Sequence, residues 1–159
     1  MHKNTRRRVS HASGYIGLGM LKAASAELAA IAIEDHFEPE VLGARVDLSM
    51  EAKDWNQVVI VARALSARAP ENERGWIAWA YALRELQQVE AAKAVLLQAE
   101  PLCGATSAVL HYNLACYYCL LGDLVTARHY LAHACTLHPD FERQAADDPD
   151  LHALKNELV

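Results

Sequence analysis

The chain has 159 residues, of which 53% are hydrophobic, with only 7 glycines and 5 prolines and a formal net charge of −5. This length suits one domain with a sizeable core, and the composition excludes a disordered chain and favours an all-helical one. The mildly negative charge provides no basic field for nucleic acid, and no apolar run approaches the roughly 20 residues that a membrane-spanning helix needs. We therefore expect neither nucleic acid nor a membrane as a partner.

The first ten residues, MHKNTRRRVS, form a basic cluster that precedes the apolar stretch GYIGLGML and an Ala24-Ser25-Ala26 site. These are the parts of a secretory signal, although glycines and Lys22 interrupt it. Alternatives are a basic tail that binds RNA or an anionic surface, and a solvated first helix end. We favour the helix, because these residues also fit the repeat described next.

A pattern recurs along nearly the whole chain with a period of 34 or 35 residues. The turn position of successive copies is occupied by Gly19, Lys53, Gln87 and Gly122. Small or medium-sized residues recur at a nearly constant spacing from each turn residue. They are Ala12, Val46, Ala80 and Ala115 before the turn, and Ala24, Val58, Ala92 and Ala127 after it. Such residues allow the backbones of two helices to approach closely. The spacing thus predicts four helical hairpins.

The copies cover residues 5–38, 39–72, 73–106 and 107–140 of one domain that spans 1–159. The first copy is the most degenerate, as suits an end repeat without a neighbour. In the second, Arg45 and Ser49 stand where large apolar residues are usual, and in the third Pro101 comes early.

The fourth copy is the most regular. Ser107 to Pro139 reads SAVLHYNLACYYCLLGDLVTARHYLAHACTLHP. Its order of Leu-Ala, Tyr, Gly-Asp, Ala, Leu, Ala and Pro resembles the tetratricopeptide repeat (TPR), in particular bacterial TPR proteins of unsettled activity. The resemblance implies an all-α, right-handed superhelix, an α-α solenoid of four hairpins with a C-terminal capping helix, that acts as an interaction scaffold with a free concave surface.

A change of pattern after Pro139 predicts the C-terminal cap, about residues 141–159. FERQAA suits one or two helical turns, and Asp148-Pro149 is a strong start for a last helix because aspartate caps and proline suits the first turn. One apolar stripe contains Leu151, Leu154 and Leu158. The opposite, solvated face is predicted to contain Asp147, Asp148 and Asp150.

Four cysteines, Cys103, Cys116, Cys119 and Cys135, are predicted to be reduced thiols in a cytoplasmic protein. Cys116 and Cys119, with His129 and His133, have the spacing of zinc ligands. In a TPR hairpin, however, the thiols would line the concave side and the imidazoles the outer flank, which argues against a shared ion. A redox role is also disfavoured, because this CxxC lies in mid-helix rather than at a helix N-terminus.

Enzyme motifs are missing from the sequence: it contains no phosphate-binding loop, no GxSxG elbow and no HExxH. Asp54 and Asp123 stand at predicted helix starts, where a carboxylate caps free N–H groups. We therefore expect no catalytic residue, cofactor or metal.

The resemblance places the binding residues on the concave side of each first helix. They are Asp47, Met50, Glu51, Arg74, Tyr81, Arg84, Tyr112, Asn113, Cys116 and Cys119. Tyrosine and arginine commonly dominate interface energies. The expected function is that of an adaptor for a peptide or helix of an unidentified protein. Alternatives are a secretion-type chaperone for apolar segments, a metal or redox protein built on Cys116 and Cys119, and a homodimer formed through the first copy.

Overall fold

The computed structural model describes residues 2–156, with side chains through Leu154, and every element in that range is a helix. The prediction of an all-α helical-repeat fold is confirmed. The chain divides into two compact units, residues 1–82 and 83–159, and the boundary falls within helix α5 (Glu73–Glu85). The prediction of a single domain stays a prediction.

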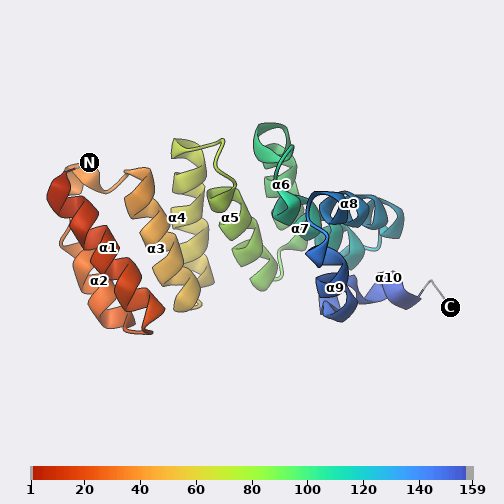
Figure 1. Cartoon of the computed structure of the whole chain (residues 1–159), viewed down its shortest axis with the longest axis horizontal. Coiled ribbons are helices and arrows are strands. Elements are labelled where there is room, and N and C mark those ends of the chain that lie inside the picture. Colours follow the sequence, from red (N-terminus) through yellow and green to blue (C-terminus); the bar gives the residue numbers. More distant parts are fainter. Residues whose placement is uncertain (1, 157–159) are drawn as a thin grey trace. The chain divides into compact units, whose positions relative to one another are not determined.

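In the first unit, α1 (Lys3–Gly17) packs against α2 (Leu21–Ala29) and α3 (Pro39–Glu51), and α3 packs against α4 (Trp55–Arg68) (Figure 1). The short 3-10 helix η1 (Ile33–Asp35) connects α2 to α3. Apolar residues of α1, α2 and α3 form one buried cluster, and those of α3, α4 and α5 form another.

The second unit contains α6 (Val89–Cys103), α7 (Ala108–Leu120) and α8 (Leu124–Leu137), followed by three short helices. These are α9 (Asp140–Asp147), the 3-10 helix η2 (Pro149–Leu151) and α10 (His152–Asn156). Helix α7 packs against α6 and α8, η2 packs on α7, and α10 contacts both α7 and α8 (Figure 1). The predicted cap thus forms as three short pieces.

The repeated small residues occupy the positions that the period predicts. Before the turns, Ala12, Val46, Ala80 and Ala115 are all buried, as are Ala24, Val58, Ala92 and Ala127 after them. Side chains of this size let paired helices approach closely and leave little cavity volume. The need for a small side chain where two helices meet therefore recurs in each copy.

Capping residues explain several helix starts. The carboxylates of Asp54 and Asp123 accept hydrogen bonds from the N–H groups of Gln57 and Thr126, at 3.1 and 3.0 Å. Ser107 caps α7 in the same way, through the N–H of Leu110 at 3.1 Å. Each bond satisfies an N–H group that the first helical turn leaves without a partner. Capping by Asp54 and Asp123 agrees with the structural role predicted for them.

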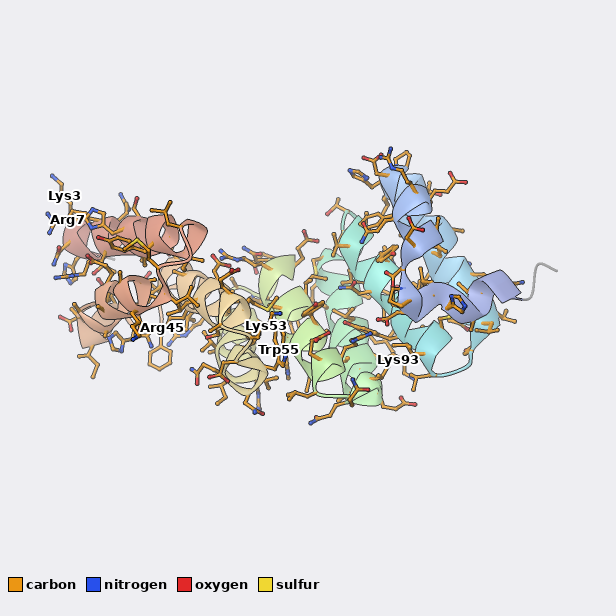
Figure 2. All side chains as sticks on the ribbon, turned by 90° about the horizontal axis from the view of Figure 1, so that it is seen from below. Lys3, Arg7, Arg45, Lys53, Trp55 and Lys93 are labelled. Atoms are coloured by element: carbon orange, nitrogen blue, oxygen red, sulfur yellow. The ribbon has the colours of Figure 1, made fainter. Side chains whose placement is uncertain are left out.

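The four predicted turn residues share one backbone feature. Gly19, Lys53, Gln87 and Gly122 have φ angles of 70°, 53°, 62° and 85°, in the left-handed region. Glycine adopts this region without a steric penalty, whereas a residue with a Cβ atom loses about 1–2 kcal/mol there. Figure 2 shows Lys53 close to Trp55, the first residue of α4. Two of the four turns therefore contain a residue that the backbone disfavours.

Replacing Lys53 by glycine is expected to increase the free energy of unfolding by about 0.5–1 kcal/mol, since relief of the Cβ strain exceeds the extra entropy of the unfolded chain. Urea unfolding followed by circular dichroism measures the change. Glycine at Ala52, where φ is −73°, is the matched control and should destabilise the chain. Equal effects of the two substitutions would contradict the strain argument.

The basic N-terminal residues belong to a helix, because α1 begins at Lys3. Lys3 and Arg7 project from one end of α1 and are exposed (Figure 2). Thr5, in contrast, is buried and donates a 2.6 Å hydrogen bond to Asp35, which also accepts the N–H of His2 at 3.0 Å. These bonds lower the pKa of Asp35, the one to Thr5 most. The solvated first helix end is thus the interpretation that the structure favours.

The second copy shows what its unusual residues do. Arg45 and Ser49 line an open pocket of about 240 Å³ in the first unit, together with Leu28 and Gln57. The Arg45 Nε atom is buried without a hydrogen-bond partner among the described residues, and Figure 2 labels the side chain. The two residues that depart from the repeat pattern therefore line a partly polar pocket of the first unit.

Pro101 lies inside the last turn of α6, which continues to Cys103. A proline in a helix lacks the N–H group that would donate to the carbonyl four residues earlier. Its early position in the third copy therefore does not end the helix at that residue.

Candidate functional site

In the first unit, the predicted binding residues lie on α3 and on the adjoining part of α5. We call Gly43, Asp47 and Met50 of α3, with Arg74 and Tyr81 of α5, the α3–α5 face. The Arg74 side chain lies across α3: it donates to the carbonyl of Gly43 at 3.0 Å and pairs with Asp47 at 2.5 Å. A Cβ atom on Gly43 would lie 2.6 Å from the Arg74 guanidinium, so the glycine provides the room for this arrangement.

Tyr81 is the large exposed residue of this face. Its side chain is 40% exposed, and its ring packs edge-on against Trp55 with 5.8 Å between centroids. Met50 is partly buried against the core of α3 and α4, whereas Glu51 is exposed at the end of α3. The α3–α5 face thus presents an aromatic ring supported by Trp55 and, about two turns away along α5, a paired guanidinium and carboxylate.

In the second unit, Tyr112, Cys116 and Cys119 follow one stripe of α7 at intervals of four and three residues. We call these three residues, with Arg84 of α5, the α7 face. Tyr112 is only 3% exposed and each thiol residue 4%. Asn113, the neighbouring predicted residue, is partly buried. Residues 140–156 of the same chain cover the α7 face, and we call them the C-terminal segment.

Two aspartates of the C-terminal segment make its polar contacts with the α7 face. Asp148 Oδ2 accepts a 2.7 Å hydrogen bond from the Tyr112 hydroxyl and is 3.9 Å from the Cys116 sulfur. Asp150 accepts from Arg84 through both carboxylate oxygens, with Nε to Oδ2 at 2.8 Å and Nη2 on the other oxygen. A bidentate pair of this kind is stronger and more directional than a single hydrogen bond.

Apolar contacts complete the attachment. The ring of Phe141 stacks on Tyr112 with 4.6 Å between centroids. Leu151 and Leu154 are buried, at 1% and 6% exposure. The predicted apolar stripe is therefore present at these two leucines, and Leu158 lies outside the described residues.

The predicted solvated acidic face is wrong for two of its three members. Asp147 is exposed as expected, but Asp148 and Asp150 turn toward Tyr112 and Arg84. The physical reason is that the α7 face offers a hydroxyl and a guanidinium, which compensate the carboxylates for the water they lose. Sequence reasoning missed this pair of residues as part of the site, and their only signal was that they flank Pro149.

The surroundings of the α7 face suppress ionisation. Burial, followed by the hydrogen bond to Asp148, raises the pKa of Tyr112. Burial and the nearby carboxylates of Asp148 and Asp150 raise the pKa of the Cys116 thiol. Burial also raises the pKa of Cys119, against the opposing effect of the Leu154 and Ala153 backbone. Since redox and metal chemistry require the thiolate, these environments argue against such roles for the two cysteines.

The chain should become less stable as the pH rises above about 8.5, where an ordinary cysteine ionises. The unfolded chain then releases the Cys116 proton, while the folded chain, with its raised pKa, retains it. Fewer protons on the unfolded state mean a free energy of unfolding that falls with pH. Urea unfolding under reducing conditions between about pH 8 and 10 measures the slope, which the variant Cys116→Ala should reduce. An unchanged slope in that variant would contradict the assignment.

His133 lies in a different environment from the thiols of Cys116 and Cys119. His133 stacks on the buried His111 with 4.1 Å between ring centroids, and His111 bonds to the Gly104 carbonyl at 2.8 Å. Among the residues that the structure describes, no three His, Cys, Asp or Glu side chains are grouped so as to bind a metal ion. In the same range, no helix has the length and apolarity needed to cross a membrane.

Antiparallel helix pairs with left-handed turn residues and buried small residues at a 34-residue period define the class: the chain has the TPR-type helical-repeat fold. Among solved structures, it is similar to TTC0263, a thermophilic TPR protein of Thermus thermophilus, with a TM-score of 0.71 and 22% identity over 97% of this chain and 82% of that one. It is also similar to a double mutant of MamA RS-1, with a TM-score of 0.73 and 17% identity over 92% and 80%. These likenesses establish the fold.

No protein-family model matches the sequence, and comparison with curated proteins gives no match either.

Proposed function

We propose that the chain is a non-enzymatic cytoplasmic adaptor that binds a peptide or helical segment of a partner protein along the faces of its first helices. Proteins of this fold are interaction scaffolds in general, since stacked hairpins expose a continuous surface made of side chains from successive repeats. The residues that would carry the binding are those of the α3–α5 face and the α7 face.

One observation supports this proposal most directly. The α7 face already contacts a polypeptide segment, the C-terminal segment of the same chain, through Tyr112 and Arg84. These side chains donate hydrogen bonds to the carboxylates of that segment, and the carboxylates of a partner peptide could accept the same bonds. The α3–α5 face contains the same residue types, Tyr81 and Arg74, and Tyr81 remains 40% exposed.

A peptide library displayed on phage, selected on the immobilised full chain, tests the proposal. Selected peptides should bind the variant Tyr81→Ala at least about tenfold more weakly, because a central tyrosine commonly contributes about 2 kcal/mol or more at an interface. Ile60→Ala is the matched control, since Ile60 is 63% exposed but lies on the second helix of its pair. Failure to select any peptide, or an equal loss in both variants, would contradict the proposal.

A further inference from the structure

We propose that the α7 face is a binding site for an acidic and apolar segment of a partner protein, and that the C-terminal segment occupies this site in competition with the partner. The recognised segment contains two acidic residues separated by one residue, and a leucine follows the second of them directly. The inference rests on the proposed function and adds the chemistry of the ligand. The α7 face is the one on which the structure shows which side-chain types fit.

The spacing of the ligand groups follows from the contacts. Asp148 and Asp150 lie two positions apart and reach two different donors, the Tyr112 hydroxyl and the Arg84 guanidinium. The backbone between them is bent by a hydrogen bond from the Asp150 N–H to Asp148 Oδ1 at 2.9 Å, with Pro149 between. Leu151 follows at once and is buried. A carboxylate, a turn, a second carboxylate and a leucine are therefore the recognised order.

The C-terminal segment has the properties of an occupant that can leave. Helix α9 has 8 residues, η2 has 3 and α10 has 5, and helices this short have little stability of their own in water. In α9, Ala145 is buried, whereas Glu142, Arg143 and Gln144 are exposed. Short terminal segments can open locally at a lower free-energy cost than global unfolding.

The face itself remains suited to a ligand when the segment leaves. Arg84 also donates a hydrogen bond to Glu85 at 3.0 Å. This contact is independent of the C-terminal segment and can orient the guanidinium when the segment leaves. Tyr112, Cys116 and Cys119 stand on α7, which packs against α6 and α8 as well as against the C-terminal segment. An incoming acidic segment would thus meet donors that are already placed.

The test uses the full chain and a double variant, Asp148→Ala with Asp150→Lys, in which the attachment of the C-terminal segment is weakened. The positive charge of the lysine would repel Arg84. The milder Asp150→Asn, and circular dichroism of both variants, guard against misfolding. The probe is a dye-labelled peptide with the sequence of residues 146–156, ADDPDLHALKN, and binding is measured by fluorescence anisotropy. Release of the segment is measured independently, as alkylation of Cys116 and Cys119 resolved by mass spectrometry.

We expect faster alkylation of both thiols in the weakened chains and binding of the probe at least about tenfold tighter than to the unchanged chain, because the competitor in cis is weakened. Adding Arg84→Glu should reduce probe binding roughly tenfold or more, since a charge-assisted pair is lost. A peptide with both aspartates replaced by asparagine is the control and should bind weakly.

Three results would overturn the inference. Exposed thiols without probe binding would show that the face does not accept such a segment from outside; the proposed function, tested at Tyr81, would remain. Protected thiols in both weakened variants would show that the carboxylates do not retain the segment. Protected thiols with a concentration-dependent dimer in light scattering would assign the site to the segment of a second copy.

Discussion

Replacing Gly75 by alanine is expected to destabilise the first unit by about 1–3 kcal/mol, the usual cost of overpacking. A Cβ atom at this position would lie 2.7 Å from the Ser66 hydroxyl oxygen, 2.8 Å from the Ser66 backbone nitrogen and 3.2 Å from the Ala62 carbonyl oxygen. Two of these atoms are backbone, so relief requires α4 and α5 to separate rather than one side chain to rotate. Urea unfolding of the full chain measures the loss.

Gly14→Ala is the matched control for this prediction. Gly14 also lies in a helix, α1, but a Cβ atom there would have no neighbour within 4 Å. Alanine should therefore stabilise the helix by about 0.5–1 kcal/mol through its better helix propensity. Opposite signs for the two substitutions would support the close approach of α4 and α5; a stabilising Gly75→Ala would rule it out.

Leu151→Ala is expected to detach the C-terminal segment while leaving the helix pairs folded. Truncating a leucine that is 1% exposed costs about 2–5 kcal/mol. Because the segment is terminal and short, this loss acts on its local attachment to α7 rather than on the whole unit. Alkylation of Cys116 and Cys119 should accelerate roughly 30-fold or more, since about 1.4 kcal/mol corresponds to a factor of ten.

The same truncation at Leu137 provides the control, because that leucine is already 37% exposed at the end of α8. It should leave the alkylation rates of Cys116 and Cys119 unchanged. Loss of most of the helical circular dichroism in Leu151→Ala would instead show that the segment is an integral part of the second unit.

The repeat architecture could be predicted from the sequence because its causes are local and recur. Helical pairs need small residues at the contact, as at Ala115 and Ala127, and a residue that turns the chain between them, as at Gly122. Each requirement returns after 34 or 35 positions. Even the turn positions without glycine, Lys53 and Gln87, adopt the left-handed backbone that the register implies. Local rules of this kind operate before any long-range contact forms.

The accessibility of the candidate site could not be predicted in the same way. The sequence placed Tyr112, Cys116 and Arg84 together by register, and their role in partner binding stays a prediction. It contained no indication that the C-terminal segment covers them, because Asp148 has an ordinary local function. One of its oxygens caps η2, as the Asp-Pro pattern predicts, and only the other reaches Tyr112, 36 positions away.

The sequence by itself thus determined the helical hairpins, their register and the turns, since periodic side-chain size and backbone preference act within one repeat. The tertiary structure alone decided which inner face is free and which is occupied. Asp150 meets Arg84 across 66 positions of sequence, and a contact of that range depends on where the folded helices bring a charge, a hydroxyl and a leucine together rather than on any local pattern.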